Sequence, residues 1–224
     1  MKPLLLSLAC LLCAVPVMAQ DDAEPTPGRL TLSANLDVVN RYYWRYVLQD
    51  EGDAAPHLQP SVTIGLGGFE ATAWASAGLG SNFAELDLIL GYRLGAFGLS
   101  YNHYLLDRFG AGEAYGEVIA SYEGGERLPI RLLAGVFVYG DEDHSTYLEA
   151  AYDLPLGAQT LSLTAGTAPS RGFYTGDGKA GVVNLGARLS REVELSGRTL
   201  SPFAGYHYNP DASKGYLLFG FSLY

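Results

Sequence analysis

Apolar and polar residues alternate from residue 30 to residue 38, which is the clearest pattern near the start of the chain. Leu30, Leu32 and Leu36 occupy alternate positions, with polar or small residues between them. An apolar residue at every second position predicts a β-strand with one apolar and one polar face. Aromatic residues continue the same parity, so we expect one strand over residues 30–48 whose apolar face ends in Tyr42, Trp44 and Tyr46.

Eleven further segments show the same alternation, and most are separated by Gly, Pro, Asn or Asp. They are residues 58–66, 69–77, 84–94, 97–105, 114–122, 129–139, 145–152, 159–167, 182–191, 199–208 and 215–224. No segment after residue 29 has the sustained periodicity of an amphipathic helix, so we expect little or no helix. An even number of strands brings the last strand back beside the first. The pattern therefore predicts an all-β fold, a closed antiparallel β-barrel of about 12 strands.

Two classes of protein have strands of this kind, a soluble barrel or sandwich and a transmembrane barrel. Aromatic placement distinguishes them, because outer-membrane barrels carry two aromatic girdles around an apolar band. If the first strand runs outward, apolar-face aromatic residues fall at two levels. The inner level holds Phe69, Tyr92, Phe97, Tyr122, Tyr152 and Tyr224, and the outer level holds Tyr42, Trp44, Tyr46, Tyr206, Tyr208 and Tyr216. We therefore expect a transmembrane barrel with periplasmic N- and C-termini, in which the opposite, small and polar faces line a wet interior.

The chain begins with features of a secretory signal peptide. Residues 1–19 contain one Lys, an apolar run and small residues before a predicted cleavage site after Ala19. Polar residues 20–29 are interpreted as a flexible periplasmic lead-in, and residues 30–224 as the barrel. Both cysteines, Cys10 and Cys13, lie in the signal peptide, so the mature chain has no disulfide. We expect a protein of the bacterial outer membrane.

Composition agrees with this class and argues against binding to nucleic acid. The net charge is −10, charged residues make up 17% of the chain, and Gly and Tyr number 28 and 16. Soluble domains have about 25% charged residues. An acidic exported chain is a poor candidate for nucleic-acid recognition.

Short motifs across nearly the whole mature chain resemble the TorF-like group of outer-membrane porins of Gram-negative bacteria. The motifs are Tyr43-Trp44-Arg45, Leu58-Gln59-Pro60-Ser61-Val62, Gly68-Phe69, Trp74 and Pro202-Phe203-Ala204-Gly205-Tyr206. The resemblance implies a β-barrel with a transport function and brings no catalytic residues.

The last strand ends in Tyr224, an aromatic terminus of the kind that the barrel-insertion machinery is thought to recognise. The residues before it fit this pattern only in part, because apolar residues are expected two and four positions before the aromatic terminus and Ser222 and Gly220 stand there. Phe219 and Phe221 lie on the opposite face of the strand. The sequence leaves open which face of this strand meets lipid.

The charged residues of the interior face form two groups along the predicted strands, one in the outer half of the barrel and one nearer the periplasm. Basic and acidic side chains are expected to face one another in the outer half, as a proposed constriction formed by Arg41, Arg45, Glu85, Asp87, Glu117 and Glu149. Such an arrangement gives a transverse field that influences which ions and solutes pass. The alternative is that these groups are ion pairs that fill a narrow interior. Further pairing is expected nearer the periplasm, among Glu70, Arg93, Arg131, Asp153 and Arg188.

Residues 168–179 form the longest predicted extracellular loop. Its Arg171, Phe173 and Tyr174 are candidates to contact a solute, although such residues often only pack a loop. The acidic turn 141–144 lacks the ligand spacing of a calcium loop, and the histidines lack zinc spacing, so no metal or cofactor is predicted.

The function that the sequence predicts is passive diffusion of small hydrophilic solutes or ions through an outer-membrane porin-like barrel. The alternatives are a side-chain-plugged structural barrel without flux and an outer-membrane lipid-modifying hydrolase. We do not expect an enzyme, because neither His103 nor His144 stands in a hydrolase motif. The expected partners are outer-membrane lipid and lipopolysaccharide, the insertion machinery and the solutes, with a monomer as the default.

Overall fold

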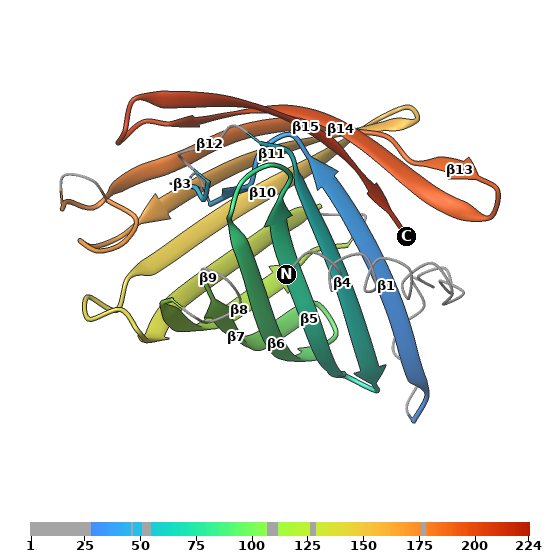
Figure 1. The fold of residues 1–224 in the computed structure, drawn as a ribbon, viewed down its shortest axis with the longest axis horizontal. Coiled ribbons are helices and arrows are strands. Elements are labelled where there is room, and N and C mark those ends of the chain that lie inside the picture. The colour runs from blue at the N-terminus through green and yellow to red at the C-terminus, as the bar shows by residue number, and fades with distance from the viewer. Residues whose placement is uncertain (1–27, 46, 51–54, 107–111, 126–128, 176–177) are drawn as a thin grey trace.

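The computed structural model describes residues 28–45, 47–50, 55–106, 112–125, 129–175 and 178–224 (Figure 1). Twelve strands form a closed antiparallel barrel, and the residues described contain no helix. The barrel strands are β1 (Leu30–Val39), β4 (His57–Leu66), β5 (Phe69–Gly78), β6 (Ala84–Leu94), β7 (Phe97–Leu105), β8 (Ala114–Glu123), β9 (Ile130–Tyr139), β10 (Thr146–Leu156), β11 (Gln159–Ala168), β12 (Gly181–Ser190), β14 (Arg198–Asn209) and β15 (Lys214–Leu223). The predicted signal peptide and most of the lead-in lie outside the described residues. In the part of the chain that is described, no helix has the length and apolar character needed to cross a membrane.

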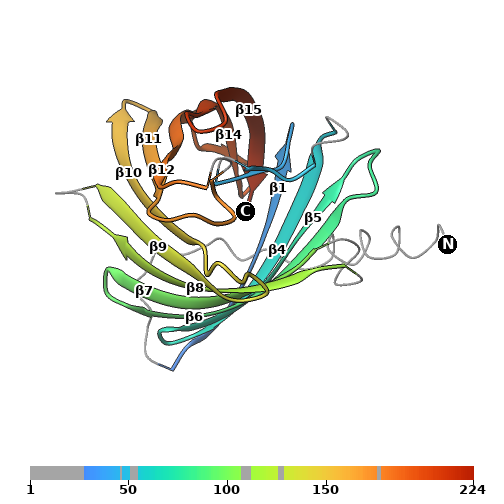
Figure 2. The ribbon, with the colours of Figure 1, turned by 90° about the vertical axis from the view of Figure 1, so that its left-hand side faces the viewer.

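Each strand pairs with its neighbour in sequence, and β1 pairs with β15 to close the ring (Figure 2). A short strand, β13 (Val193–Leu195), extends β12 along β14 beyond the barrel. Closure satisfies the backbone hydrogen-bonding groups that a sheet edge would expose. The predicted fold class, a closed antiparallel barrel of 12 strands, is confirmed.

The two ends of the barrel differ in their connections. β1 begins and β15 finishes at one end, called here the short-turn end, where β4–β5, β6–β7, β10–β11 and β13–β14 are joined by two-residue turns and only the β8–β9 connection, residues 124–129, is longer. Gly67, Gly95, Gly157 and Gly197 have positive φ in these turns, a conformation that glycine adopts without strain. Longer connections lie at the opposite end, called here the loop end.

The chain between β1 and β4 folds into the barrel instead of prolonging the first strand. β1 ends at Val39, after which Asn40 bonds to β15 through its backbone N–H and its side chain. Two short strands then form an inner hairpin, defined here as β2 (Tyr43–Trp44), Arg45 and β3 (Val47–Leu48). The prediction of one strand over residues 30–48 is wrong because the chain leaves the barrel wall at residue 40.

The aromatic residues of this segment are therefore not part of an outer girdle. Tyr42, which precedes the hairpin, is only 6% exposed and packs against Trp74 in a tilted arrangement, at 5.4 Å between ring centroids. Tyr43 packs against Tyr216 in the same way at 5.3 Å, so Tyr216 also faces inward. Tyr46 lies outside the described residues. Burying aromatic rings inside the barrel removes a large apolar area from water, which favours the inward path.

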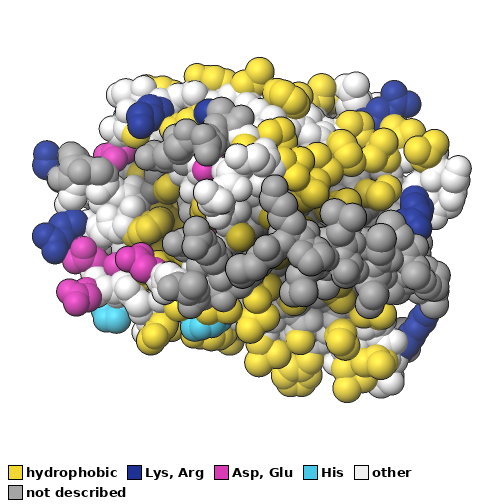
Figure 3. Space-filling model, viewed as in Figure 1, with side chains coloured by type: hydrophobic (Ala, Val, Ile, Leu, Met, Phe, Trp, Pro, Cys, Tyr) yellow, Lys and Arg dark blue, Asp and Glu magenta, His cyan; other side chains and the backbone are white. Residues whose placement is uncertain are grey.

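The outer face of the barrel is apolar between its ends. Large hydrophobic side chains such as Leu90, Leu99 and Ile64 are at least half exposed there. Figure 3 shows hydrophobic side chains across the middle of the visible face, with charged side chains toward the two ends. On β15 the outward residues are Leu217, Phe219 and Phe221, whereas Leu218 and Ser222 line the interior. The structure thus decides the face that the sequence left open.

Candidate functional site

The interior contains a cavity of about 540 Å³ that the inner hairpin bounds. Aromatic rings form part of its wall, including Tyr43, Trp44, Trp74 and Phe203. Polar and charged side chains form the rest, among them Arg41, Arg188, Asp37, Glu149, Asn184 and His207. A concave space with apolar walls and a few polar groups has the character of a small-molecule site.

Arg45, at the tip of the inner hairpin, is bound to Glu117 on β8 and to Tyr174 in the 169–180 connection. Its Nη1 donates to Glu117 Oε1 at 2.5 Å and to the Tyr174 hydroxyl at 2.7 Å. Tyr104 donates to the second oxygen of Glu117 at 2.6 Å. The side chains of Arg45 and Glu117 are only 9% and 0% exposed, so this is a buried ion pair. A buried pair of this kind needs such additional hydrogen bonds to offset its desolvation.

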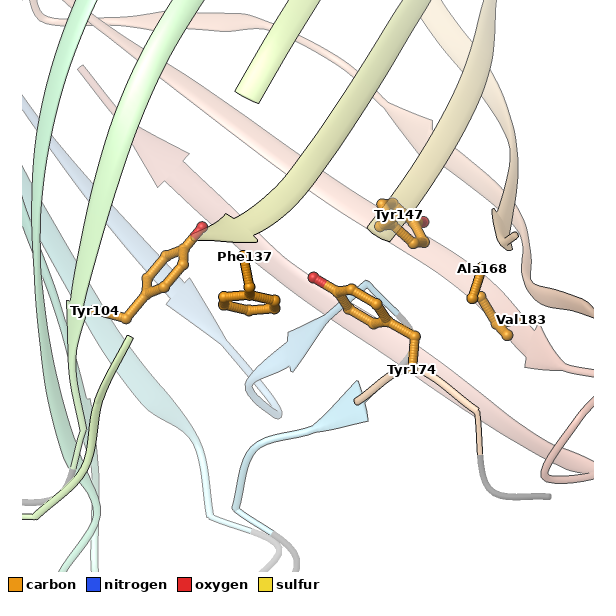
Figure 4. Packing of buried hydrophobic residues seen from close by; sticks show 6 residues of the cluster. All are labelled: Tyr104, Phe137, Tyr147, Ala168, Tyr174 and Val183. Atoms are coloured by element: carbon orange, nitrogen blue, oxygen red, sulfur yellow. The ribbon is translucent and has the colours of Figure 1, made fainter. Parts of the chain in front are cut away.

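Aromatic rings surround this ion pair and fill the interior near the loop end. The cluster consists of Tyr104, Phe137, Tyr147, Ala168, Tyr174 and Val183, which come from several strands and from the 169–180 connection (Figure 4). The Arg45 guanidinium lies 4.6 Å from the Trp44 ring centroid and 5.0 Å from that of Tyr147. Trp44 also packs on Tyr174 at 5.9 Å. The hairpin therefore lies inside the lumen and packs against this cluster.

The surroundings of Arg45 and Tyr174 determine the protonation states of these two side chains. Burial lowers the pKa of Arg45, but Tyr174 and the Glu117 carboxylate raise it by more, so the guanidinium stays charged. Burial raises the pKa of the Tyr174 hydroxyl and outweighs the opposing effect of Arg45. Tyr174 therefore stays neutral across the physiological range.

Local backbone features position both partners of the ion pair. Arg45 has a φ of 44°, the left-handed conformation that turns the hairpin. Glu117 follows a register shift in β8. Across from it, Gly135 leaves room, because a Cβ there would meet the Glu117 carboxylate and lie 3.3 Å from Arg45 Nη1. The absence of a side chain at residue 135 thus lets the hairpin dock.

Glu85 and Asp87 lie side by side on β6, without an ion pair to any described cation. They are 3% and 7% exposed, and one oxygen of each lacks a hydrogen-bond partner among the described residues. Tyr42 packs nearby, and burial, followed by the charges of Glu85 and Asp87, raises the pKa of its hydroxyl. These two carboxylates are covered by the chain segment that enters the barrel, and they do not line the cavity.

The remaining members of the proposed constriction lie at the cavity. Arg41 and Glu149 both line it, and Glu149 accepts a hydrogen bond from Tyr147 at 2.6 Å. Of the four predicted acids, Glu117 is the one that ion-pairs with a predicted arginine in the described structure. The transverse constriction itself stays a prediction.

The loop residues pack against the barrel and do not reach the cavity. Arg171 pairs with Asp143 at 2.9 Å at the exposed loop end. Phe173 packs on Trp44 and Phe137, and Tyr174 is buried beside Arg45. None of the three lines the cavity. The 169–180 connection therefore helps to hold the inner hairpin.

Nearer the short-turn end, the expected pairing occurs between Arg131 and Asp153, at 2.8 Å. Arg93 pairs at 3.2 Å with Glu123, an acid outside the expected set, and neither Glu70 nor Arg188 makes an ion pair within the described residues. Arg188 instead lies over the Phe203 ring, 3.6 Å from its centroid. Alternation identifies the charged side chains as inward-facing, but it does not show which of them meet.

A hydrogen-bonded chain of Asp50, His57 and Ser76 has the residue types of a hydrolytic site. His57 Nδ1 lies 3.0 Å from Ser76 Oγ, and its Nε2 lies 3.2 Å from Asp50 Oδ2. Both His57 and Ser76 are 0% exposed, so a substrate cannot reach them in this conformation. Such a chain serves here to join the 40–56 connection to β4 and β5.

Among the residues that the structure describes, neither of the two histidines considered for hydrolysis has a serine as a hydrogen-bond partner. His103 lies on the outer face, with Nδ1 3.3 Å from the Tyr101 hydroxyl. His144 Nδ1 lies 3.0 Å from the Phe137 carbonyl oxygen. Within the described residues, no group of three or more His, Cys, Asp or Glu is arranged to hold a metal ion.

Comparison with protein-family models and with curated proteins gives no match for this chain.

Proposed function

We propose that this protein is a porin-like barrel of the bacterial outer membrane that lets small hydrophilic solutes or ions diffuse across. The observation that carries the proposal is a closed barrel with an apolar outer face and a polar interior cavity. Closed barrels are the β-structures that satisfy every backbone group within a bilayer. Strands of 9 to 12 residues are long enough to cross it when tilted.

The proposed orientation places the short-turn end in the periplasm and the loop end outside. Short periplasmic turns and longer extracellular loops are typical of outer-membrane barrels. The outer face then contacts lipid and lipopolysaccharide, and the last strand engages the insertion machinery. The aromatic pairs Phe69–Tyr92 and Phe97–Tyr122, at 4.6 and 5.2 Å, would lie at the periplasmic interface. The resemblance to TorF-like porins supports the same assignment, and we propose a monomer.

The inner hairpin would set the narrowest point of the pathway. Arg41, Arg45 and Glu149 would influence the charge of what passes, while Glu117 holds the hairpin from the wall. Because the hairpin packs on opposite walls of the lumen, a solute must pass beside it or displace it.

A second candidate function is a structural barrel without flux. The buried Arg45–Glu117 pair and the ring cluster around it favour this alternative. The two candidates differ in permeability and not in fold.

The test is permeability of proteoliposomes that contain the purified barrel. Swelling rates with neutral sugars of increasing size, compared with protein-free liposomes, should show passage with a size limit. Planar bilayers that contain the same protein should show discrete conductance steps. Liposomes that stay impermeable even to the smallest solutes would reject the porin-like function and favour the structural barrel.

A further inference from the structure

Arg188 is held in the cavity by stacking on an aromatic ring. Its guanidinium carbon lies 3.6 Å from the ring centroid of Phe203, which projects inward from the neighbouring strand. Gly220 lies opposite Phe203 on β15, and a Cβ there would be 3.1 Å from Phe203 Cζ. A glycine at this position therefore gives the ring room to lie where Arg188 covers it.

The N–H donors of Arg188 are not used within the described structure. Arg188 makes no side-chain hydrogen bond or ion pair there, whereas Arg93 and Arg131 each pair with an acid. A guanidinium that is oriented by stacking keeps its planar set of donors for a ligand. Carboxylates match this geometry with two parallel hydrogen bonds.

The other groups of the cavity restrict the charge and character of such a ligand. Arg41 adds a second cation without a described ion pair, but Asp37 on β1 and Glu149 on β10 bring two negative charges to the same cavity. A multiply charged anion would be repelled by these carboxylates. Asp37 Oδ1 has no hydrogen-bond partner among the described residues, so it is suited to accept from a hydroxyl group.

The aromatic side chains of the cavity wall offer apolar contacts to the same ligand. Tyr43, Trp44 and Trp74 present rings to a cavity of about 540 Å³. Aromatic faces pack against the C–H faces of hydroxylated carbon chains, while the polar groups fix orientation.

We infer that the cavity binds small hydroxylated monocarboxylates, with Arg188 on Phe203 as the group that receives the carboxylate. This inference rests on the proposed function, because it names the class of solute that the lumen selects. Arg188 acts by direct contact, Phe203 is its positioning residue, and Asp37 accepts from a hydroxyl.

Intrinsic fluorescence measures the binding directly, because both tryptophans of the chain, Trp44 and Trp74, line the cavity. The folded protein in detergent would be titrated with gluconate, with sorbitol as a neutral match, with glucosamine as a cation and with inorganic phosphate. We expect a saturable change with gluconate, and a much weaker one or none with the other three.

Two variants separate the site from general effects on folding. Arg188→Gln breaks no described ion pair, so the barrel should fold, and gluconate affinity should fall about tenfold to a hundredfold. Phe203→Leu keeps the charge but removes the stack, and should weaken binding in the same direction. Arg93→Gln, which alters an inward arginine outside the cavity lining, is the matched control and should bind gluconate as the parent does.

Equal responses to gluconate and sorbitol, or unchanged gluconate affinity in Arg188→Gln, would overturn the inference. Tighter binding of phosphate than of gluconate would overturn the monocarboxylate class. The titration needs no membrane, so it is independent of flux. Saturable gluconate binding in a barrel whose liposomes are impermeable would support the site and reject the porin-like function. Sugar flux without gluconate binding would do the reverse.

Discussion

Removal of the Arg45 side chain should release the inner hairpin and open the lumen. In Arg45→Ala, Glu117 loses its cation while it remains 0% exposed at the barrel wall. One hydrogen bond, from Tyr104, is left to the carboxylate among those described. Taking one partner from a buried ion pair costs about 3–5 kcal/mol, because the other charge is left without compensation.

The barrel can avoid this cost without unfolding. The hairpin strands form their own two-stranded sheet, and their described residues make no ladder hydrogen bonds to the barrel wall. Undocking lets water reach Glu117 while the closed ring of strands stays intact. The ratio of docked to undocked hairpin should therefore fall by a factor on the order of 10² to 10⁴.

Single-channel recording in planar bilayers measures this ratio as the fraction of time spent at low conductance. Arg171→Ala is the control, because its ion pair with Asp143 is solvent-exposed and should change little. Gly135→Ala should open the channel as Arg45→Ala does, since its Cβ would meet the Glu117 carboxylate.

A double variant tests the electrostatic reasoning itself. Arg45→Met with Glu117→Leu removes both charges and keeps apolar volume, so the hairpin should dock again. If the double variant is as open as Arg45→Ala, the uncompensated charge is not the cause. If Arg45→Ala conducts like the parent, the hairpin is not the plug.

Two further predictions concern the membrane. Leu90→Lys, at the middle of the outer face of β6, should destabilise the barrel in lipid by about 2–4 kcal/mol, whereas Leu94→Lys near the short-turn end should cost about 0–1 kcal/mol. Urea unfolding in vesicles measures both, and equal costs would contradict a bilayer around the barrel. For orientation, Asp143→Cys should react with a membrane-impermeant maleimide on intact cells, and Ser196→Cys only after the outer membrane is permeabilised. The mature chain offers no competing thiol, since both cysteines lie in the predicted signal peptide. Labelling of Ser196→Cys alone on intact cells would reverse the assignment.

Much of the barrel could be predicted from alternation, because successive residues of a strand lie in turn on an apolar face and on a polar face of the sheet. Every second residue meets the same face, so the expected segments from residue 58 onward agree with the observed strands to within one residue at each end, except that β10 continues four residues further, to Leu156. Strand parity likewise identified Glu117, Glu149 and Arg188 as inward-facing. The last strand has apolar residues on both of its faces, so its sequence does not show which face is outward. Its pairing with β1 and β14 in the closed barrel decides this.

The sequence by itself determined the closed antiparallel barrel, the number of its strands and the inward position of Glu117, Glu149 and Arg188. Only the tertiary structure decided that the chain leaves the wall after Val39 and that Arg45 docks inside the barrel against Glu117 and Tyr174. The residues that hold Arg45 lie 72 and 129 positions away, at Glu117 and Tyr174. Alternation reports which face a residue shares with its near neighbours. It carries no information about which distant side chain, across a closed ring of strands, will meet it.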